Sequence, residues 1–508
     1  MLFNSYIFIF GFLPITFSIF FLVGRFSPRI ACAWLTLTSL VFYGWWSANY
    51  VILLLGSITF NYCVAQIIGA KTIAAQPGRK ALILALGIAI NLVALGYYKY
   101  TDFFITVTND TIGTDWTLRR IILPLGISFF TFTQIAFLVD ASRGEAASKD
   151  FLRYCLFVSY FPHLLAGPII HHKQVMPQFA KPETYRLSAV NIALGLTMFV
   201  IGLSKKVLIA DTVSPVANLI FSSTTDLDLV SAWVGVLAYA MQLYFDFSGY
   251  SDMAIGLSLL FNVRLPFNFD SPYQATSIIE FWRRWHMTLS TFLRDYLYIP
   301  LGGNRHGEGR RFANIYITML LGGLWHGAGL TFVLWGALHG FYLVVNHAWR
   351  RLSFGATPRK VFQALSWAAT FVAVIYAWIL FRSPDLHTAF RITASTLGAH
   401  GLGFNRDAIH DALVHLPDFD RSNSLLIPIA LLISWLLPNS QQIAGLAELP
   451  PRWLKYLAPA AACFQPASAI RDPRSQSAVY LWSAVLGLMF CLCLLRLNHV
   501  SDFIYYQF

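Results

Sequence analysis

Histidine in apolar surroundings is the feature of this sequence best suited to chemistry. His326 lies in LLGGLWHGAGLTFVLWGALHG (320–340), where glycines surround a Trp-His pair in an otherwise hydrophobic run. Glycines permit a close backbone approach or a helix break, and an ionisable group in such surroundings is costly, so it is a functional candidate by default. A buried neutral imidazole suits general-base work near neutral pH. The alternative is a hydrogen-bonded packing histidine, and the local pattern leaves both open.

A second histidine lies among arginines. His286 belongs to the segment FWRRWHMTLSTFLRDY (281–296), which also carries Arg283, Arg284 and Arg294. Guanidinium groups bind phosphate oxygens in a bidentate manner, so this charge set suits a phosphate-bearing ligand. The alternative is an interfacial segment whose arginines anchor it at the lipid surface.

The same segment has helical periodicity, with its apolar residues on one face. The spacing predicts one amphipathic helix at or below the cytoplasmic interface, ended by YIPLGGNRHGEGRR (298–311). The residues expected on its apolar face are Trp282, His286, Leu289 and Leu293.

The other ionisable residues fit structural roles better. His339 is expected to pack or gate rather than to catalyse. Asp140, Asp246 and Asp252 lie in or at the ends of apolar runs. A proton relay is conceivable there, but pairing with an arginine or capping a helix is the commoner outcome.

No metal site is expected, because the histidine groups lack compact ligand spacing. These groups are His171 and His172 beside Lys173, and the set His387, His400, His410 and His415. The six cysteines lie mostly in apolar runs and are interpreted as core packing.

Composition restricts the protein class. The chain is 57% hydrophobic and 12% charged, against about 25% charged residues in soluble domains, which excludes a soluble enzyme. Runs that are apolar on all sides, such as 478–495, exclude a transmembrane β-barrel. The net charge of +12 fits cytoplasmic Lys and Arg in a membrane protein, so no nucleic acid partner is expected. The sequence predicts an all-α, polytopic integral membrane protein.

Ten clear hydrophobic spans and four broken ones predict about 11–14 transmembrane or re-entrant helices. The clear spans are 5–24, 30–47, 51–69, 81–98, 121–140, 187–204, 229–246, 361–381, 425–437 and 478–496, and the broken ones are 151–170, 251–263, 312–329 and 330–348.

Loop charge predicts the orientation, with basic clusters facing the cytoplasm and the N-terminus outside. Lys205 and Lys206 are assigned to one such cytoplasmic loop. Segments placed outside are 108–115, 222–229 and 383–424. The other basic clusters are Arg25 with Arg29, Lys71 with Arg79 and Lys80, Arg143 with Lys149, and Arg350, Arg351, Arg359 and Lys360.

Residues 241–340 resemble the membrane-bound O-acyltransferase family, and specifically its bacterial alginate O-acetyltransferase branch. The resemblance rests on YFDFSGYSDMAIGLSLLFNVRLPFNFDSPYQATSI, FWRRWHMTLSTFLRDYLYIPLGGNR and GGLWHGAGLTFVLWGALHG, in that order. Supporting segments are LPLGISFFTFTQIAFLVDASRG, FPHLLAGPI and WILFRSPDLHTAF. It extends from the N-terminus to about residue 390, and the region after 400 is weakly informative.

The resemblance implies helices around a central funnel or tunnel, with the family histidine near its floor. That histidine corresponds to His326 and the family's second motif histidine to His286, both expected to be catalytic. It implies a single membrane domain over 1–508, with N-terminal helices in 1–240, a catalytic core in 241–349 and C-terminal helices in 350–508 with an outer loop near 383–424. The residues expected to bind substrate are Trp325, Arg283, Arg284, Arg294, Asn304 and Arg305.

The implied activity is transfer of acetyl from a cytoplasmic donor, acetyl-CoA, across a bacterial inner membrane to an extracytoplasmic polysaccharide. His326 would deprotonate the acceptor hydroxyl, or carry the acetyl group itself, with His286 as a candidate donor to the oxyanion. No permanently bound cofactor is expected, and the expected partners are membrane lipid and extracytoplasmic acetyltransferase proteins. The acceptor stays open among alginate-like exopolysaccharide, cellulose and peptidoglycan. The alternatives are D-alanyl transfer to teichoic acid, a lipid or polysaccharide transporter, and a scaffold for a secretion complex.

Overall fold

Every regular element that the structure describes is helical. The computed structural model describes residues 1–145, 150–352, 360–402, 422–448, 476–499 and 503–504, and no β-strand occurs in them. The all-α prediction is therefore confirmed. His410, His415, residues 403–421 of the predicted outer loop 383–424, and Cys463 lie outside the described residues.

The chain forms two compact units, and it passes between them within helix α10 (Ala189–Ser204), within helix α12 (Leu229–Leu260) and between Phe267 and Asn268. Unit 1 comprises residues 1–199 and 251–267, and unit 2 comprises 200–250 and 268–508. The other helices of unit 1 are η1 (Ile7–Phe12), α1 (Leu13–Gly24), α2 (Pro28–Gly44), α3 (Ala48–Gly69), α4 (Lys71–Ala74), α5 (Pro77–Ile112), α6 (Ile127–Ser142), α7 (Phe151–Ser159), α8 (Phe161–Leu164), α9 (His172–Val175), η2 (Gln178–Ala180) and η3 (Pro182–Tyr185).

Unit 2 contains the segments in which the candidate histidines lie. Its helices besides the end of α10 and most of α12 are η4 (Lys205–Ala210), α11 (Asp211–Ser222), η5 (Pro272–Gln274), α13 (Ile278–Arg284), α14 (Met287–Leu293), η6 (Arg294–Tyr298), α15 (Gly307–His326), α16 (Leu330–Leu352), α17 (Lys360–Arg382), α18 (Leu386–Thr396), α20 (Ser422–Leu436), α21 (Ser440–Ile443), α24 (Gln476–Arg496) and η8 (Leu497–His499).

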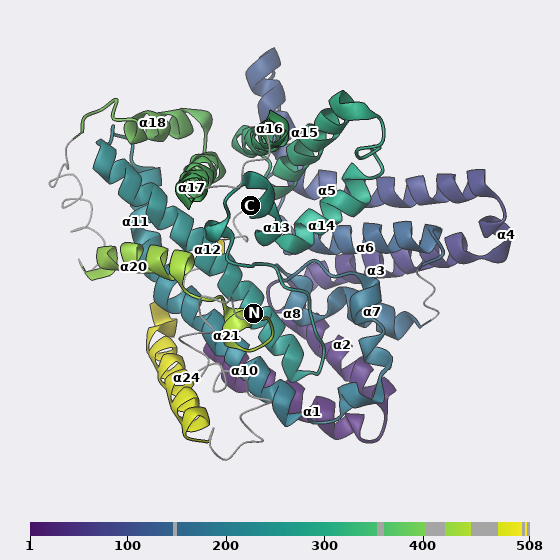
Figure 1. Cartoon of the computed structure of the whole chain (residues 1–508). Coiled ribbons are helices and arrows are strands. Elements are labelled where there is room, and N and C mark those ends of the chain that lie inside the picture. Colours follow the sequence, from purple (N-terminus) through teal and green to yellow (C-terminus); the bar gives the residue numbers. More distant parts are fainter. Residues whose placement is uncertain (146–149, 353–359, 403–421, 449–475, 500–502, 505–508) are drawn as a thin grey trace. The chain divides into compact units, whose positions relative to one another are not determined.

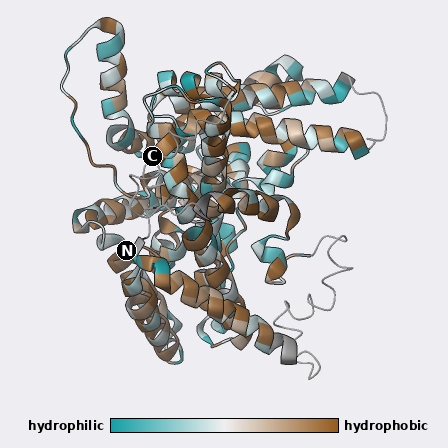
Figure 2. Cartoon of the chain, turned by 90° about the vertical axis from the view of Figure 1, so that its left-hand side faces the viewer, coloured by the Kyte–Doolittle hydropathy of each residue, from teal (hydrophilic) through white to brown (hydrophobic). Residues whose placement is uncertain are grey.

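Seven helices in the described residues are long and apolar enough to cross a membrane. Large apolar side chains such as Phe10, Ile52 and Val93 are exposed on them, a pattern that suits contact with lipid rather than water. Hydrophobic residues run along much of the helical surface in Figure 2. These helices confirm a polytopic membrane protein, whereas the count of 11–14 and the central funnel stay predictions. The seven are Ile7–Gly24, Ala48–Gly69, Pro77–Ile112, Ala189–Ser222, Leu229–Leu260, Leu330–Arg351 and Lys360–Arg382.

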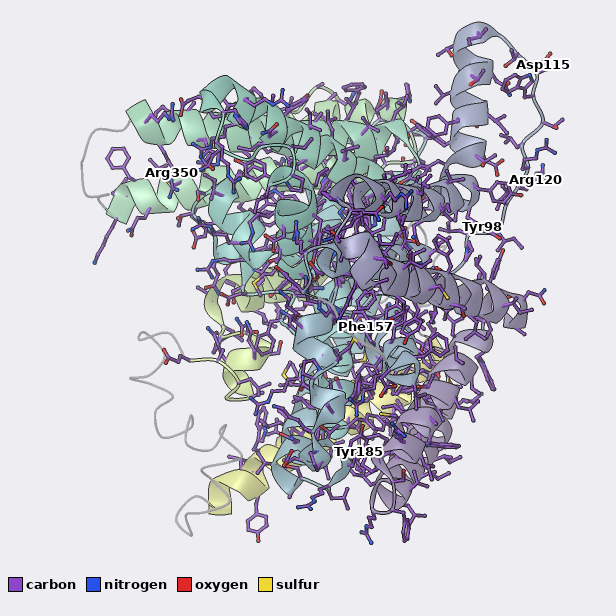
Figure 3. The ribbon with its side chains drawn as sticks, turned by 90° about the vertical axis from the view of Figure 1, so that its right-hand side faces the viewer. Tyr98, Asp115, Arg120, Phe157, Tyr185 and Arg350 are labelled. Atoms are coloured by element: carbon purple, nitrogen blue, oxygen red, sulfur yellow. The ribbon has the colours of Figure 1, made fainter. Side chains whose placement is uncertain are left out.

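In unit 1, α3, α5 and α6 run side by side (Figure 1). Helix α5 is longer than its predicted span because it continues to Ile112, where Gly113 in the left-handed conformation (φ 75°) ends it. The loop that follows carries Asp115 and Arg120 (Figure 3). Helix α6 begins later than predicted, at Ile127, after Gly126 at φ 73°.

Lys205 and Lys206 lie inside a helical run, which corrects their assignment to a loop. The π-helical turn η4 joins α10 to α11, so the helix continues through both lysines. Lys206 is 3% exposed, and its Nζ lies 2.7 Å from carboxylate oxygens of both Asp211 and Asp246. Burial of this cation is offset by two carboxylates in direct contact, a compensation that loop-charge reasoning does not consider.

Helices α15 and α16 pack closely because glycines face each other between them. A Cβ added at Gly336 would collide with the backbone of Met319, and one at Gly323 would lie 3.0 Å from the Gly336 Cα. The two helices lie side by side in Figure 1. This confirms the expected close backbone approach around His326.

Substitution of Gly336 by alanine is expected to lower the thermal stability of the purified protein. The added methyl group must push α15 from α16, and such overpacking costs about 1–3 kcal/mol. The matched control is Gly309→Ala in the same hairpin, where a Cβ meets no atom within 4 Å. Unfolding midpoints in detergent compare the two variants, and equal midpoints would contradict the close packing.

Candidate functional site

His326 is the last residue of α15 and is buried at 4% exposure. Gly327 follows in an extended conformation (φ −155°, ψ 152°), so the helix ends directly after the imidazole. Aromatic rings enclose the side chain, with ring centroids 4.9 Å away at Trp325, 5.0 Å at Trp335 and 5.2 Å at Phe381. Water is therefore largely excluded around this histidine.

The segment expected to form one amphipathic helix is two short helices, which corrects the sequence interpretation. Helix α13 ends at Arg284 and α14 begins at Met287. Between them His286 adopts the left-handed conformation (φ 44°, ψ 52°), which is uncommon for residues other than glycine. The break occurs at the candidate histidine, well before the predicted break at 298–311.

Asn268 holds the chain in this broken conformation. Its carbonyl oxygen accepts the Met287 N–H at 3.0 Å. Its side-chain Oδ1 lies 2.8 Å from Thr288 Oγ1 and 3.0 Å from His286 Nδ1, and it accepts the Thr288 N–H. These bonds replace those that a continuous helix would make. Sequence reasoning missed Asn268, which lies in the non-helical stretch between α12 and η5, where no periodic pattern singles it out.

The contact with Asn268 selects one tautomer of His286. The backbone N–H of Thr288 can only donate, so it identifies the Asn268 atom as the oxygen. A bond from His286 to that oxygen places the ring proton on Nδ1 and leaves Nε2 as the basic atom. Complete burial lowers the pKa of His286 to about 3, so the ring is neutral at pH 7. This tautomer suits a proton acceptor rather than the oxyanion donor expected from the sequence.

The fold brings the two candidate histidines together. The ring centroids of His286 and His326 are 6.4 Å apart, and Trp325 lies against both, at 6.2 Å and 4.9 Å. Phe247 of α12 covers His286 edge-on at 4.8 Å. The arrangement is a buried histidine pair with aromatic walls, and an imidazole in such a site can accept a proton from a substrate that enters it.

Trp335 adds a hydrogen-bond donor to the aromatic walls around the histidine pair. It is 1% exposed, its ring meets His326 edge-on, and its Nε1–H has no acceptor within the described part of the chain. An unsatisfied buried N–H is costly, and it is suited to an oxygen supplied by a substrate. Sequence reasoning did not single out this tryptophan.

His339 lies one aromatic layer further away, on α16. It is fully buried, its ring centroid lies 4.7 Å from that of Trp335, and its Nδ1 accepts the indole N–H of Trp282 at 3.2 Å. These contacts describe a packed histidine within the aromatic cluster.

The predicted substrate-binding arginines differ from the buried histidine pair because they are more exposed, and two of them form ion pairs with neighbouring carboxylates. Arg284 is bound to Glu280 at 2.9 Å and lies 3.9 Å from Asp270, and Arg294 is bound to its neighbour Asp295 at 2.7 Å. Arg283 is exposed, and among the described residues no ion pair is found for it. Asn304 and Arg305 are exposed in the turn before α15.

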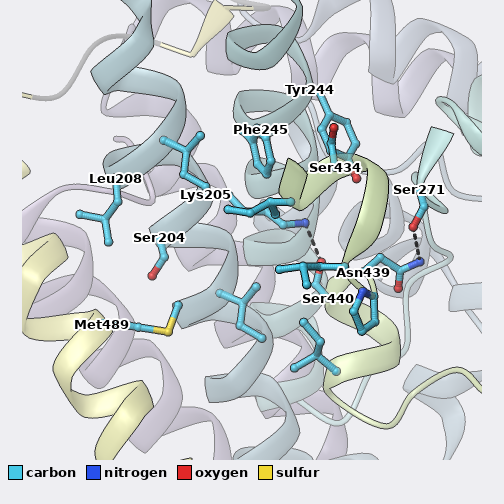
Figure 4. A pocket seen from close by; sticks show the side chains of 16 residues that line it. Ser204, Lys205, Leu208, Tyr244, Phe245, Ser271, Ser434, Asn439, Ser440 and Met489 are labelled. Carbon is cyan, nitrogen blue, oxygen red and sulfur yellow. Dashed lines mark hydrogen bonds between the residues drawn. The ribbon is translucent and has the colours of Figure 1, made fainter. Parts of the chain in front are cut away.

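A cavity of about 230 Å³ lies in unit 2, but none of the eight residues predicted from the sequence lines it. Its walls are mostly apolar, and Lys205 Nζ donates to Ser440 Oγ at 2.7 Å within it, next to Asn439 and Ser271 (Figure 4). The ring centroid of Tyr244, a residue in the cavity wall, lies 6.3 Å from the ring centroid of Trp285, the residue before His286. Neither histidine of the pair lines the cavity.

Two of the intramembrane carboxylates have the basic partners expected of structural groups. Asp140 lies 3.7 Å from Arg143, and Asp246 is bound to Lys206 and accepts the Ile504 N–H at 2.9 Å. Asp252 belongs to unit 1 and is 9% exposed.

Comparison with known families places the histidine pair within a matched region. The model of MBOAT, the membrane-bound O-acyltransferase family, matches residues 107–383. Both histidines and all the predicted substrate-binding residues fall within it.

Individual proteins similar to this chain cover much of its length. The peptidoglycan O-acetyltransferase of Helicobacter pylori is 45% identical over 79% of this chain and 81% of its own length. The probable alginate O-acetylase of Pseudomonas aeruginosa is 38% identical over the whole of both chains. The teichoic acid D-alanyltransferase of Bacillus subtilis is 25% identical over 53% of this chain and 71% of its own length.

Replacement of Asn268 by leucine is expected to reduce activity by about 100-fold or more, because His286 loses the bond that sets its tautomer and position. Asn268→Asp retains the acceptor oxygen and is the matched control, expected to retain more activity. Acyl transfer is measured in membranes that hold equal amounts of each variant. Equal activity of Asn268→Leu and the parent would contradict a positioning role for this amide.

Proposed function

The chain belongs to the membrane-bound O-acyltransferase family and is an O-acyltransferase; from this premise we propose that it transfers acetyl groups from acetyl-CoA to hydroxyl groups of an extracytoplasmic polysaccharide. The acetyl group and the polysaccharide class are inferred from the names of the two O-acetylating relatives. The observation that carries the proposal is the buried pair of His286 and His326, 6.4 Å apart within aromatic walls.

His326 is the general base of the proposed reaction. It takes the proton of the acceptor hydroxyl as that oxygen attacks the thioester carbonyl carbon. The tetrahedral intermediate collapses, the carbon–sulfur bond breaks, and the proton passes from His326 to the departing CoA thiolate. The products are an acetyl ester and free CoA, so no external reductant or oxidant is needed.

His286 and Trp335 support this step from two sides. His286 Nε2 accepts a hydrogen bond from the acceptor hydroxyl and orients it for attack, in line with the tautomer set by Asn268. The indole N–H of Trp335 donates to the carbonyl oxygen as negative charge develops on it. Such a donor contributes most where water is excluded, as it is beside the rings around His326.

A covalent route uses the same histidine as a nucleophile. His326 would attack the thioester, release CoA and hold the acetyl group until an acceptor oxygen displaces it. This route allows the acetyl group to be taken up on one face of the membrane and delivered on the other. Trapping of acetylated protein without acceptor separates it from direct transfer.

The arginines are assigned to the donor. Arg283, Arg284, Arg294 and Arg305 would hold the CoA phosphates at the cytoplasmic side, with Asn304 as a further polar contact. Trp325 would line the path of the acetyl group between the two histidines. We place the protein in the bacterial inner membrane, with an extracytoplasmic acetyltransferase protein as the partner that completes transfer to the polymer.

The acceptor is proposed as a class, a sugar hydroxyl of alginate-like exopolysaccharide, cellulose or peptidoglycan. D-alanyl transfer to teichoic acid is the second candidate, carried by a relative of lower identity and shorter coverage. The two differ in product, an acetyl ester against an aminoacyl ester.

His326→Ala is expected to abolish O-acetylation of the cell's exopolysaccharide or wall, because His326 is the group that takes the hydroxyl proton in the proposed reaction. The control His387→Ala removes an exposed histidine of unit 2 and is expected to have no effect. Ester content is measured by mild base release of acetate or alanine, with variant levels in the membrane checked by immunoblot. Unchanged esters in His326→Ala would refute the assignment, and loss of alanine alone would favour the second candidate.

Trp335→Phe is expected to lower kcat by about 100-fold while KM for acetyl-CoA changes little. The phenyl ring retains much of the packing, so the variant removes mainly the N–H that meets the developing charge. Steady-state kinetics in detergent or nanodiscs measure kcat and KM separately for the parent and the variant. A change confined to KM would assign Trp335 to substrate binding instead.

A further inference from the structure

Unit 1 brings together two histidines and one aspartate that are far apart in sequence. Asp140 lies in the last turns of α6, whereas His171 and His172 lie at the start of α9. The ligand atoms of the three side chains all lie within 4.8 Å of one another. We propose that this cluster binds a divalent transition-metal ion, with Zn²⁺ as the first candidate, a site independent of the histidine pair in unit 2.

The distances suit shared coordination. His171 Nε2 lies 3.1 Å and His172 Nδ1 lies 3.2 Å from the same oxygen, Asp140 Oδ2. Zinc binds His nitrogen and carboxylate oxygen at about 2.0–2.2 Å, so two ligands at a tetrahedral angle are about 3.4 Å apart. The two nitrogen–oxygen distances are therefore within a few tenths of an ångström of the value expected around one ion, and all three ligand atoms lie within 4.8 Å of one another.

Hydrogen bonding at His172 favours a cation between its ring and the carboxylate. Its Nε2 lies 3.2 Å from the carbonyl oxygen of Glu145, which can only accept, so Nε2 carries a proton. A neutral ring then presents the lone pair of Nδ1 to Asp140 Oδ2 at 3.2 Å. Two lone pairs at this distance require a proton or a metal ion between them.

The surroundings match those of metal-binding histidines, whose second nitrogen commonly donates to a backbone carbonyl. The carboxylate is held as well, because Asp140 Oδ1 faces the Arg143 guanidinium at 3.7 Å. Asp140 is 1% exposed and His172 is 8% exposed, whereas the His171 side chain at 29% provides a route to solvent. The site is preorganised and accessible.

The donor set selects the class of ion. Two imidazoles and one carboxylate suit Zn²⁺ and related first-row ions, whereas Mg²⁺ and Ca²⁺ prefer oxygen ligands throughout. Glu145 is bound to Lys173, so its carboxylate is engaged elsewhere. A fourth position would be taken by water, as in zinc sites with three protein ligands. Such an ion would tie the end of α6 to α9.

The test uses the full chain, purified in detergent with a tag that contains no histidine. After EDTA treatment and its removal, Zn²⁺ is titrated against a chromophoric chelator, and bound metal is counted by mass spectrometry. The parent is expected to retain one Zn²⁺ per chain. His172→Gln and Asp140→Asn are expected to weaken the affinity by about 100-fold.

The matched control is His400→Gln, which removes a histidine that also contacts a carboxylate, Asp226 at 3.3 Å, and it is expected to bind as the parent does. Melting curves distinguish loss of metal caused by misfolding from loss of metal caused by removal of a ligand. Zn²⁺ should raise the melting temperature of the parent and of His400→Gln but not that of His172→Gln, while the metal-free midpoints stay similar. If the parent binds no metal, or if His172→Gln and Asp140→Asn bind it as tightly as the parent does, the proposal is overturned, and a shared proton then accounts for the contact between His172 and Asp140.

Discussion

The hydrogen bonds of Asn268 hold the break between α13 and α14, and the geometry of the histidine pair depends on this break. A continuous helix would satisfy its own backbone and would direct the side chain of His286 by periodicity alone. Instead, Asn268 accepts the Met287 N–H through its carbonyl oxygen and binds His286 and Thr288 through its side chain. One buried amide therefore stabilises the left-handed residue, selects its tautomer and brings its ring to 6.4 Å from His326.

The chemistry of the pair follows from its aromatic surroundings. Rings of Trp325, Trp335, Phe381 and Phe247 exclude water but offer few polar groups, so burial favours neutral imidazoles. In the proposed reaction, neutral rings accept protons and the indole N–H of Trp335 would donate where charge develops. Elsewhere in unit 2, Lys206 is neutralised by Asp211 and Asp246, and the predicted donor-binding arginines lie at exposed or half-buried positions. Under the proposed function, these arginines would hold the anionic donor while its reacting end lies among the rings.

Small residues and buried ion pairs give this arrangement its rigidity. Gly323 and Gly336 let α15 and α16 approach closely, which fixes the end of α15 where His326 lies. In unit 1, Asp140 gathers Arg143, His171 and His172 around one carboxylate. In the buried ion pairs, a charged group that is costly to bury lies beside a specific neighbour that compensates for its charge. Lipid and packed side chains supply no water to do so.

The sequence by itself determined the class of the molecule, because long apolar runs can be satisfied in lipid only by helices. It also singled out His326, as an ionisable residue in an apolar run beside glycines, and His286, as a histidine among arginines. The break at His286, the buried state of Lys206 and the cluster at Asp140 were decided by tertiary structure. In each, the compensating partner comes from a distant segment: Asn268 for His286, Asp246 for Lys206, His171 and His172 for Asp140. Local periodicity and charge counting describe only neighbours along the chain, so they cannot foresee a hydrogen bond or ion pair made across it.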